Sequence, residues 1–253
     1  MIRKAATFAS VAMALAPLSA GNEPAQRVLV VVAHPDDELT MAPAIAAMAR
    51  QGRAVTILFA TPGDQGPGVT NLEPGPELGK VRRAEAECSA TALGAEARFI
   101  DGVGDGTLAQ SPQSPGSPAN RFIDLFAIHY VERAPALVLT WGPDGGYGHS
   151  DHRMVSSLVS QTMQSLASEY RPPLLYVGIP AGRLPPVPEM AQWSESDPKL
   201  LTESFRYTSA DLAAATAAAQ CHVTQFDDAS RAGMMPLFDA TIWQGKVHFR
   251  RAF

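Results

Sequence analysis

The chain has 253 residues, enough for one large domain with a buried core. Hydrophobic residues make up 46% and charged residues 18%, which excludes a disordered tail or a coiled coil. Twenty basic against 25 acidic residues give a net charge of −5, whereas proteins that bind nucleic acid through its phosphates carry a basic excess. Two cysteines are too few for a zinc ribbon. We expect an acidic globular protein with no nucleic-acid partner.

The N-terminus has the pattern of a signal peptide. Two basic residues precede an uncharged, mainly apolar run over 5–18, which ends in the small residues Ser19 and Ala20. The run is too short to favour a membrane span. We expect residues 1–20 to be a signal peptide and 21–253 to be the domain of an exported protein, periplasmic or secreted, with no stable membrane span. An uncleaved anchor or a frayed terminus is the alternative.

Removal of that segment leaves 18 basic and 25 acidic residues, a net charge of −7, which disfavours a polyanionic substrate. Export also permits a disulfide between Cys88 and Cys221, because oxidising compartments preserve such bonds. Two cysteines in a sequence do not show that they meet, so this pairing is left open.

Patterns of buried strands and of helices alternate along the chain. The run 28–32 is continuously apolar and β-branched, as expected of a strand buried on both faces. Further strands are expected at 55–60, 97–100, 136–140 and 174–179, and helices from 39 to a stop at Gly52 and at 81–93, 121–132, 151–167 and 211–220. Loops rich in Gly and Pro are expected at 61–80, 102–120 and 180–199, and the last thirty residues have no clear pattern. The alternation predicts a single α/β domain with a largely parallel sheet and helices on both faces.

The sequence AHPDDE at 33–38 directly follows the first predicted strand. In open α/β sheets, functional sites form beyond the carboxyl ends of strands. Four ionisable groups within five residues are incompatible with core packing, because each buried charge needs a partner. A solvated turn is the alternative, but His, two Asp and Glu after five apolar residues are unusual for a turn. We predict a site here.

A second cluster, GGYGHSDH at 145–152, follows the strand that ends at Thr140. The sheet can therefore bring both clusters to the same edge. His149 and His152 are three residues apart, which places them on one face at the start of a helix. A lone histidine is more often structural than a ligand, but two beside a second ionisable cluster favour a metal site.

The two clusters together offer imidazoles and carboxylates without any thiolate, a donor set that suits zinc or another borderline divalent ion. Three protein ligands leave a position for water, as in catalytic zinc sites. Such a metal lowers the pKa of its water from about 15.7 to about 7 and polarises a carbonyl oxygen. A nearby carboxylate can accept the proton, and a histidine can stabilise the oxyanion. This machinery is suited to amide hydrolysis.

These motifs resemble the PIG-L/LmbE-like zinc N-deacetylases, which include N-acetylglucosaminyl-phosphatidylinositol and mycothiol-pathway deacetylases. The resemblance runs from about Arg27 to Leu158. AHPDDE and GPDGGYGHSDH at 142–152 are its specific anchors, while TPGDQG, Arg82-x-x-Glu85 and Asp105-Gly106 are weaker ones. The chain departs from the family at Ser150, where proline is common, and at Asp64, where glutamate is frequent. No motif follows Leu158, so the residues that shape the substrate site are not predicted.

The resemblance implies a Rossmann-like fold and a metal ion held by His34, Asp37 and His152. That metal is expected to be zinc, with ferrous iron or another divalent metal left open.

The resemblance also implies roles in catalysis. Asp36 would be the general base, His149 would stabilise the oxyanion or act as an acid, and Tyr147 matches a tyrosine that approaches the substrate carbonyl in some relatives. Arg82 and Asp105 are weaker candidates for substrate contact. A helix-face ion pair for Arg82 and a turn for Asp105 are their alternatives.

Other polar and aromatic residues have two interpretations. Glu38 either supports a ligand or caps the following helix, and Trp141 either stacks on a sugar or belongs to the core. The remaining histidines, His129, His222 and His248, are expected to be structural or surface groups. The glycines at 102–106 lack dinucleotide-binding spacing, so no nucleotide cofactor is expected there.

We therefore expect a zinc-dependent hydrolase that removes an N-acetyl group from an amino sugar or its conjugate. Hydrolysis of another amide, an ester or a phosphoester is one alternative, although two-metal phosphatases need more ligands than these clusters supply. A non-catalytic carbohydrate-binding protein is another, and the presence of every proposed ligand argues against it. The oligomeric state is not predicted.

Overall fold

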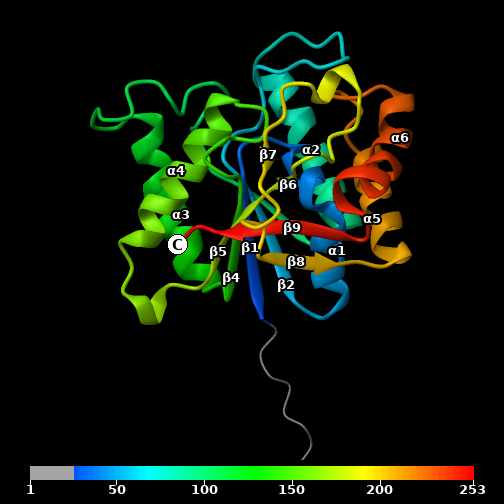
Figure 1. Ribbon diagram of the computed structural model, residues 1–253. Coiled ribbons are helices and arrows are strands. Elements are labelled where there is room, and N and C mark those ends of the chain that lie inside the picture. The colour runs from blue at the N-terminus through cyan, green and yellow to red at the C-terminus, as the bar shows by residue number, and fades with distance from the viewer. Residues whose placement is uncertain (1–25) are drawn as a thin grey trace, which may run out of the picture.

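A computed structural model describes residues 26–253, so the predicted signal peptide lies outside the described residues. A seven-stranded sheet with the order β3-β2-β1-β4-β5-β9-β8 runs through the centre, between two layers of helices (Figure 1). Its strands are β1 (Arg27–Val32), β2 (Ala54–Phe59), β3 (Glu96–Phe99), β4 (Leu137–Thr140), β5 (Leu174–Val177), β8 (Glu203–Arg206) and β9 (Lys246–Arg251). Strands β6 (Ile179–Pro180) and β7 (Glu195–Ser196) form a separate pair.

Within residues 26–253, six α-helices flank the sheet. They are α1 (Ala42–Arg50), α2 (Pro76–Ala92), α3 (Pro118–Arg133), α4 (Ser150–Gln164), α5 (Ser209–Gln220) and α6 (Asp228–Phe238). Helices α1, α2, α5 and α6 cover one face and α3 and α4 cover the other (Figure 1). The predicted Rossmann-like α/β fold with helices on both faces is therefore confirmed.

Strand β1 lies inside the sheet, between β2 and β4, and helices cover both of its faces. Val28, Val30 and Val32 belong to the hydrophobic cluster that includes α1 and α5, whereas Leu29 and Val31 belong to the cluster that includes α3 and α4. A strand covered by helices on both sides needs apolar residues at every position, which is what the run 28–32 supplies.

The order of the strands creates a crevice beside β1. The chain runs from β1 outward to β2 and β3, then returns to β4 on the other side of β1, and all these strands are parallel. Loops that leave the carboxyl ends of β1 and β4 therefore diverge, and ligands bind in the gap between them. The two predicted clusters follow these two strands.

Helices α2 and α3 begin inside stretches that were expected to be loops. Pro76 and Pro118 stand in their first turns, where the missing proline N–H breaks no helical hydrogen bond. The side chain of Ser117 also caps α3 by accepting the N–H of Asn120. Pro76 and Pro118 thus mark helix starts, while the other prolines of these stretches lie in loops and turns as expected. The last thirty residues form α6, a π-helical turn (Asp239–Trp243) and β9.

Cys88 on α2 and Cys221, directly after α5, form a disulfide with 5.8 Å between their Cα atoms. The pairing that the sequence leaves open is therefore made. None of the helices in residues 26–253 has the length and apolar character that a membrane crossing requires.

Loss of the Cys88–Cys221 disulfide should lower the stability of the protein. The bond spans 133 residues, and in the chain-entropy account closing a loop of this size stabilises the fold by about 5 kcal/mol. Urea unfolding should show a lower midpoint for the Cys88→Ser/Cys221→Ser double variant than for the wild type. Dithiothreitol should lower the wild-type midpoint and leave that of the variant unchanged, and equal midpoints without reductant would contradict the prediction.

Candidate metal centre and active site

The two motif clusters meet at the carboxyl ends of β1 and β4. Nδ1 of His34 and Nε2 of His152 lie 3.1 Å apart, although 118 positions separate the two residues. Both imidazoles are buried, His34 at 6% exposure and His152 at 0%. The parallel pairing of β1 with β4 brings the segments together, and the first turn of α4 directs His152 back toward the sheet.

Asp37 completes this arrangement with its carboxylate. Its Oδ2 accepts hydrogen bonds from the backbone N–H groups of Ala33 and His34, each at 2.9 Å, and from Nε1 of Trp141 at 3.1 Å. Its Oδ1 lies 3.0 Å from Nε2 of His152. Burial raises the pKa of Asp37, but His152, His34 and these hydrogen bonds together hold it well below its usual range. The side chain is therefore a fixed anion with one oxygen aimed at the histidines.

Polar contacts on the far sides of the two rings define which nitrogens face each other. Nδ1 of His152 donates to the carbonyl of Gly145 at 3.1 Å, which leaves the lone pair on Nε2. Nε2 of His34 lies 2.9 Å from Oδ1 of Asp105 and 3.5 Å from Oδ2 of Asp151, contacts that favour its protonated form. Burial lowers the pKa of His34, but the carboxylates of Asp105, Asp151 and Asp37 raise it to about 10.

This donor set fits a divalent metal. Two imidazole nitrogens and a carboxylate oxygen converge in a buried, negatively charged site, where a metal cation would offset the negative charge and take the place of the proton between the two facing nitrogens. For a tetrahedral zinc ion with bonds of about 2.0–2.1 Å, neighbouring ligand atoms lie about 3.3 Å apart. The separations of 3.1 and 3.0 Å that His152 makes with His34 and Asp37 are close to this value, and the third, between Nδ1 of His34 and Oδ2 of Asp37, is longer at 3.8 Å. His34, Asp37 and His152 would hold the ion.

Two further groups of donor atoms surround His34. The ligand atoms of His34, His149 and His152 lie within 4.8 Å of one another, and so do those of His34, Asp105 and Asp151. His149 thus stands beside the proposed ligands. Its Nδ1 accepts the N–H of Asp151 at 3.2 Å, so Nε2 carries the proton. Burial lowers the pKa of His149, and His34 and His152 lower it further, which favours a neutral ring that donates from Nε2.

Asp36 lies beside the same crevice in a constrained conformation. Its φ is 99°, in the left-handed region that residues other than glycine rarely adopt. Burial raises the pKa of Asp36, Arg82 lowers it and Asp37 raises it again, to about 6. A carboxylate with this pKa is suited to accept a proton near neutral pH.

Arg82 binds Asp36 rather than a neighbour on its own helix. Its guanidinium donates to Oδ2 of Asp36 at 2.9 Å and to the carbonyls of Pro35 and Gly63, each at 2.7 Å. The residue is 3% exposed. The contacts observed for Arg82 therefore orient Asp36, and the predicted contact with substrate stays a prediction.

Asp105 and Tyr147 occupy different parts of the site. Asp105 contacts His34 and accepts the N–H of Gln65 at 3.2 Å, so its present contacts orient the imidazole. Tyr147 is 43% exposed at the rim, with its ring centroid 5.1 Å from that of His152. Burial and the nearby carboxylates raise the pKa of Tyr147, so its hydroxyl stays protonated and able to donate a hydrogen bond.

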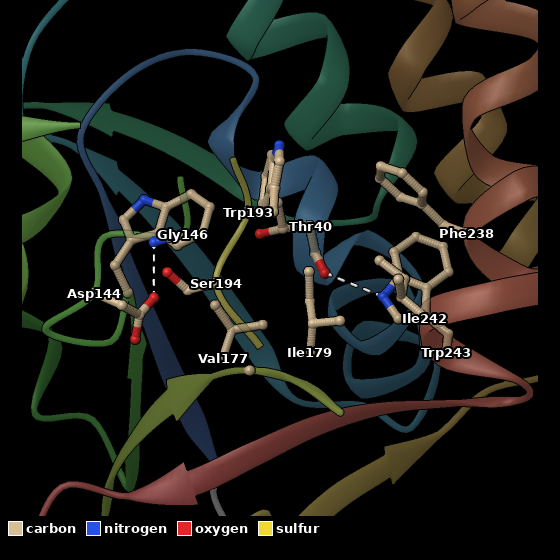
Figure 2. Close-up of a pocket in the computed structure, with 12 residues that line it drawn as sticks. Thr40, Asp144, Gly146, Val177, Ile179, Trp193, Ser194, Phe238, Ile242 and Trp243 are labelled. Carbon is tan, nitrogen blue, oxygen red and sulfur yellow. Dashed lines mark hydrogen bonds between the residues drawn. The ribbon is translucent and has the colours of Figure 1, made fainter. Parts of the chain in front are cut away.

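Trp141 is both a core residue and part of the site. Its ring stacks on His152, with 4.6 Å between centroids and 7° between planes, while it is only 2% exposed. Trp141 also lines a pocket together with Trp193, Trp243, Phe238 and polar groups including Asp144 (Figure 2). Its cavity of about 20 Å³ has room for about one water molecule rather than a sugar ring. The pocket supports the site, and a sugar would bind outside it.

Two buried residues close to the predicted site residues were not singled out as site residues in the sequence, and one of them, His222, was expected to be structural or on the surface. Asp151 is fully buried, accepts the N–H of Gly106 at 2.7 Å and faces His34, and its place between the two histidines of the motif was the available signal. His222 is also fully buried and binds Glu38 at 2.7 Å. No local signal pointed to this contact, because its partners are 184 positions apart.

The chain belongs to the PIG-L family, described as GlcNAc-PI de-N-acetylase, which residues 29–163 match. It is 34% identical over 165 residues to the 1D-myo-inositol 2-acetamido-2-deoxy-alpha-D-glucopyranoside deacetylase of Rhodococcus erythropolis, covering 58% of this chain and 56% of that protein. The Streptomyces griseus protein of the same name is 36% identical over 51% of this chain and 46% of its own. The chain thus spans about half the length of the curated relatives it matches.

Solved structures share the fold across most of the chain. The 4-carboxy-2-hydroxymuconate hydratase of Pseudomonas putida has a TM-score of 0.65 at 21% identity, covering 90% of this chain and 96% of its own. The N,N'-diacetylchitobiose deacetylase of Pyrococcus horikoshii has a TM-score of 0.64 at 19% identity, covering 90% of this chain and 84% of its own. The same fold therefore occurs in a hydratase and in a deacetylase, so the reaction has to be argued from the site.

Replacing His152 with alanine should abolish stoichiometric metal binding, because one of two facing imidazoles is lost. Changes outside the ligand shell alone weaken metal affinity by about 10- to 100-fold, so the Kd should rise by more than about 100-fold. Elemental analysis after dialysis against zinc measures this loss. The His129→Ala variant, altered on α3 outside the site, should keep its metal. A fully loaded His152→Ala protein would remove His152 from the ligand set.

Proposed function

We propose that this protein is a zinc-dependent hydrolase that removes the N-acetyl group from an amino sugar or its conjugate. The observation that carries the proposal is the convergence of His34, Asp37 and His152 in one buried crevice, with Asp36 and His149 beside it. Family membership and the sugar deacetylases among its relatives support the same reaction. Water and an N-acetyl amide would give acetate and a free amine.

Asp36, His149 and Tyr147 would each have a separate role in accepting or donating protons. Asp36 would accept a proton from the attacking water, and Arg82 holds its carboxylate in place for that step. His149 would donate a hydrogen bond from Nε2 to the oxyanion that develops on the acetyl oxygen. The proton that Asp36 accepts from water would go to the leaving amine, directly or through a His149 ring that has first taken it up. The hydroxyl of Tyr147 would donate to the same carbonyl oxygen from the rim.

A zinc ion held by His34, Asp37 and His152 would lower the pKa of water and polarise the acetyl carbonyl. The chain supports such a cation through the outer contacts of these ligands. Gly145 and Asp105 orient the two imidazoles, and Trp141 with two backbone N–H groups orients Asp37. Ferrous iron suits the same donors, so metal reconstitution with each ion belongs in the assay.

Metal-loaded enzyme should release acetate and an equal amount of free amine from N-acetylglucosamine or its glycosides. Asp36→Ala should lower kcat by about 10²- to 10⁴-fold, the range supplied by general-base catalysis, while metal content stays at the wild-type level. Mass spectrometry for loss of an acetyl group and elemental analysis give the two readouts.

Asp101→Ala provides the matched control, because that exposed carboxylate pairs with Arg83 away from the crevice and its loss should leave kcat unchanged. Wild-type kcat in metal-loaded Asp36→Ala would disprove the assigned base. Release of phosphate, or of an acid from other amides and esters in place of acetate, would favour a different hydrolase. Stoichiometric metal without turnover would indicate a binding protein.

We propose further that the protein is exported after removal of residues 1–20. The Cys88–Cys221 disulfide supports this location, since such bonds persist in oxidising compartments. Mass spectrometry of the protein purified from its own cells should find a mature N-terminus near Gly21 and no free thiol. An intact N-terminus at Met1 on a reduced cytoplasmic protein would contradict export.

A further inference from the structure

A buried polar network lies behind Asp36. Glu38 is fully buried, and its Oε2 accepts the backbone N–H of Asp36 at 2.9 Å. Its Oε1 accepts the hydroxyl of Ser89 at 2.5 Å and faces Nε2 of His222 at 2.7 Å. A buried carboxylate is tolerated only with such partners. Glu38 therefore connects the backbone of Asp36 to α2 and to the segment after α5.

The conformation of Asp36 depends on these contacts. A left-handed φ in a non-glycine residue persists where the surroundings fix it from several sides. Glu38 binds the N–H of Asp36, while Arg82 binds its carboxylate and the carbonyl of Pro35. Loss of the contact with Glu38 or with Arg82 would let the backbone of Asp36 relax toward a φ that non-glycine residues commonly adopt. The carboxylate of Asp36 would then move away from the crevice.

The disulfide lies next to both donors that hold Glu38. Cys88 precedes Ser89, and Cys221 precedes His222, so the bond joins the two short segments from which these donors project. A second attachment lies beside it, where Glu85 on α2 accepts the N–H and the hydroxyl of Thr224 at 2.8 and 2.7 Å. His222 is thus fixed against α2 on both sides of its position in the chain.

We propose that His222 is a positioning residue for Asp36, acting through Glu38 and held in place by the Cys88–Cys221 disulfide. The inference rests on the proposed function, in which Asp36 is the base. It adds a part of the chain that the family match does not cover, because that match ends at residue 163. Reduction by a dithiol, which forms its own cyclic disulfide as Cys88 and Cys221 become thiols, would loosen this support without touching the metal ligands.

His222→Ala and His222→Gln test the role of the ring. A glutamine amide can donate to Glu38 as Nε2 of His222 does, whereas alanine leaves the carboxylate without that partner. In metal-saturated protein, alanine should lower kcat by about 10- to 100-fold, because a small displacement of a catalytic group is costly, with KM and metal content unchanged. Glutamine should restore most of kcat. His248→Ala, which removes a buried histidine on β9, is the control and should keep wild-type kcat.

Hydrogen exchange of residues 33–41 gives a readout that does not depend on turnover. His222→Ala, and the Cys88→Ser/Cys221→Ser variant below its unfolding temperature, should exchange faster there than wild type, whereas His222→Gln and His248→Ala should not. The Cys88→Ser/Cys221→Ser variant and wild type treated with dithiothreitol should both have a lower kcat than untreated wild type, and by a similar factor. Wild-type kcat and exchange in His222→Ala would overturn the proposal, as would equal loss of kcat in the alanine and glutamine variants.

The two proposals fail in different ways. If metal-loaded wild type releases no acetate from any substrate, the proposed function fails, and exchange at 33–41 alone then decides whether His222 positions Asp36. If wild type releases acetate and His222→Ala matches it in kcat and exchange, the function stands and the positioning role is wrong.

Discussion

The site depends on two imidazole nitrogens that face each other 3.1 Å apart in a buried crevice with an ionised carboxylate beside them. Such an arrangement is unfavourable without a positive charge, supplied either by a proton or by a metal ion. Neighbouring elements make it persist. The β1–β4 pairing sets the distance, the Gly145 carbonyl and Asp105 set the orientation of the rings, and Trp141 holds both His152 and Asp37.

The parts of this arrangement that follow from short-range patterns could be predicted. The apolar run of β1 fixes a central strand, and parallel strands place their carboxyl ends together, so the meeting of the HPDDE and GHSDH segments follows from topology. The start of α2 was missed because Pro76 is equally compatible with a loop and with a first helical turn. The Cys88–Cys221 bond was left open because it joins distant segments whose packing no local pattern encodes.

The sequence predicted which residues lie near the site, but not which partners their side chains contact. Arg82 and Asp105 were the weaker candidates for substrate contact, which stays a prediction, and the contacts that the structure shows for them, with Asp36 and with His34, were not predicted. The direction of a buried polar side chain depends on which other buried polar groups need a hydrogen-bond partner, and tertiary packing decides this. Glu38 illustrates this dependence. Its neighbour Asp36 is two residues away, while its other partners, Ser89 and His222, come from α2 and the segment after α5.

Part of the site comes from the chain beyond the family match. A hydratase and a deacetylase have this fold, so the fold alone does not select the reaction, and the family match ends at residue 163. After residue 163, the ring centroid of Trp193 lies 5.3 Å from that of Tyr147 and 6.2 Å from that of Trp141. The second part of the chain therefore forms part of the rim of the candidate metal centre. An aromatic rim of this kind offers a flat apolar face beside polar groups, which suits stacking on a sugar. His222 comes from the same later region and contacts Glu38, so the half of the chain without motifs contributes both to the rim and to the polar network next to Asp36.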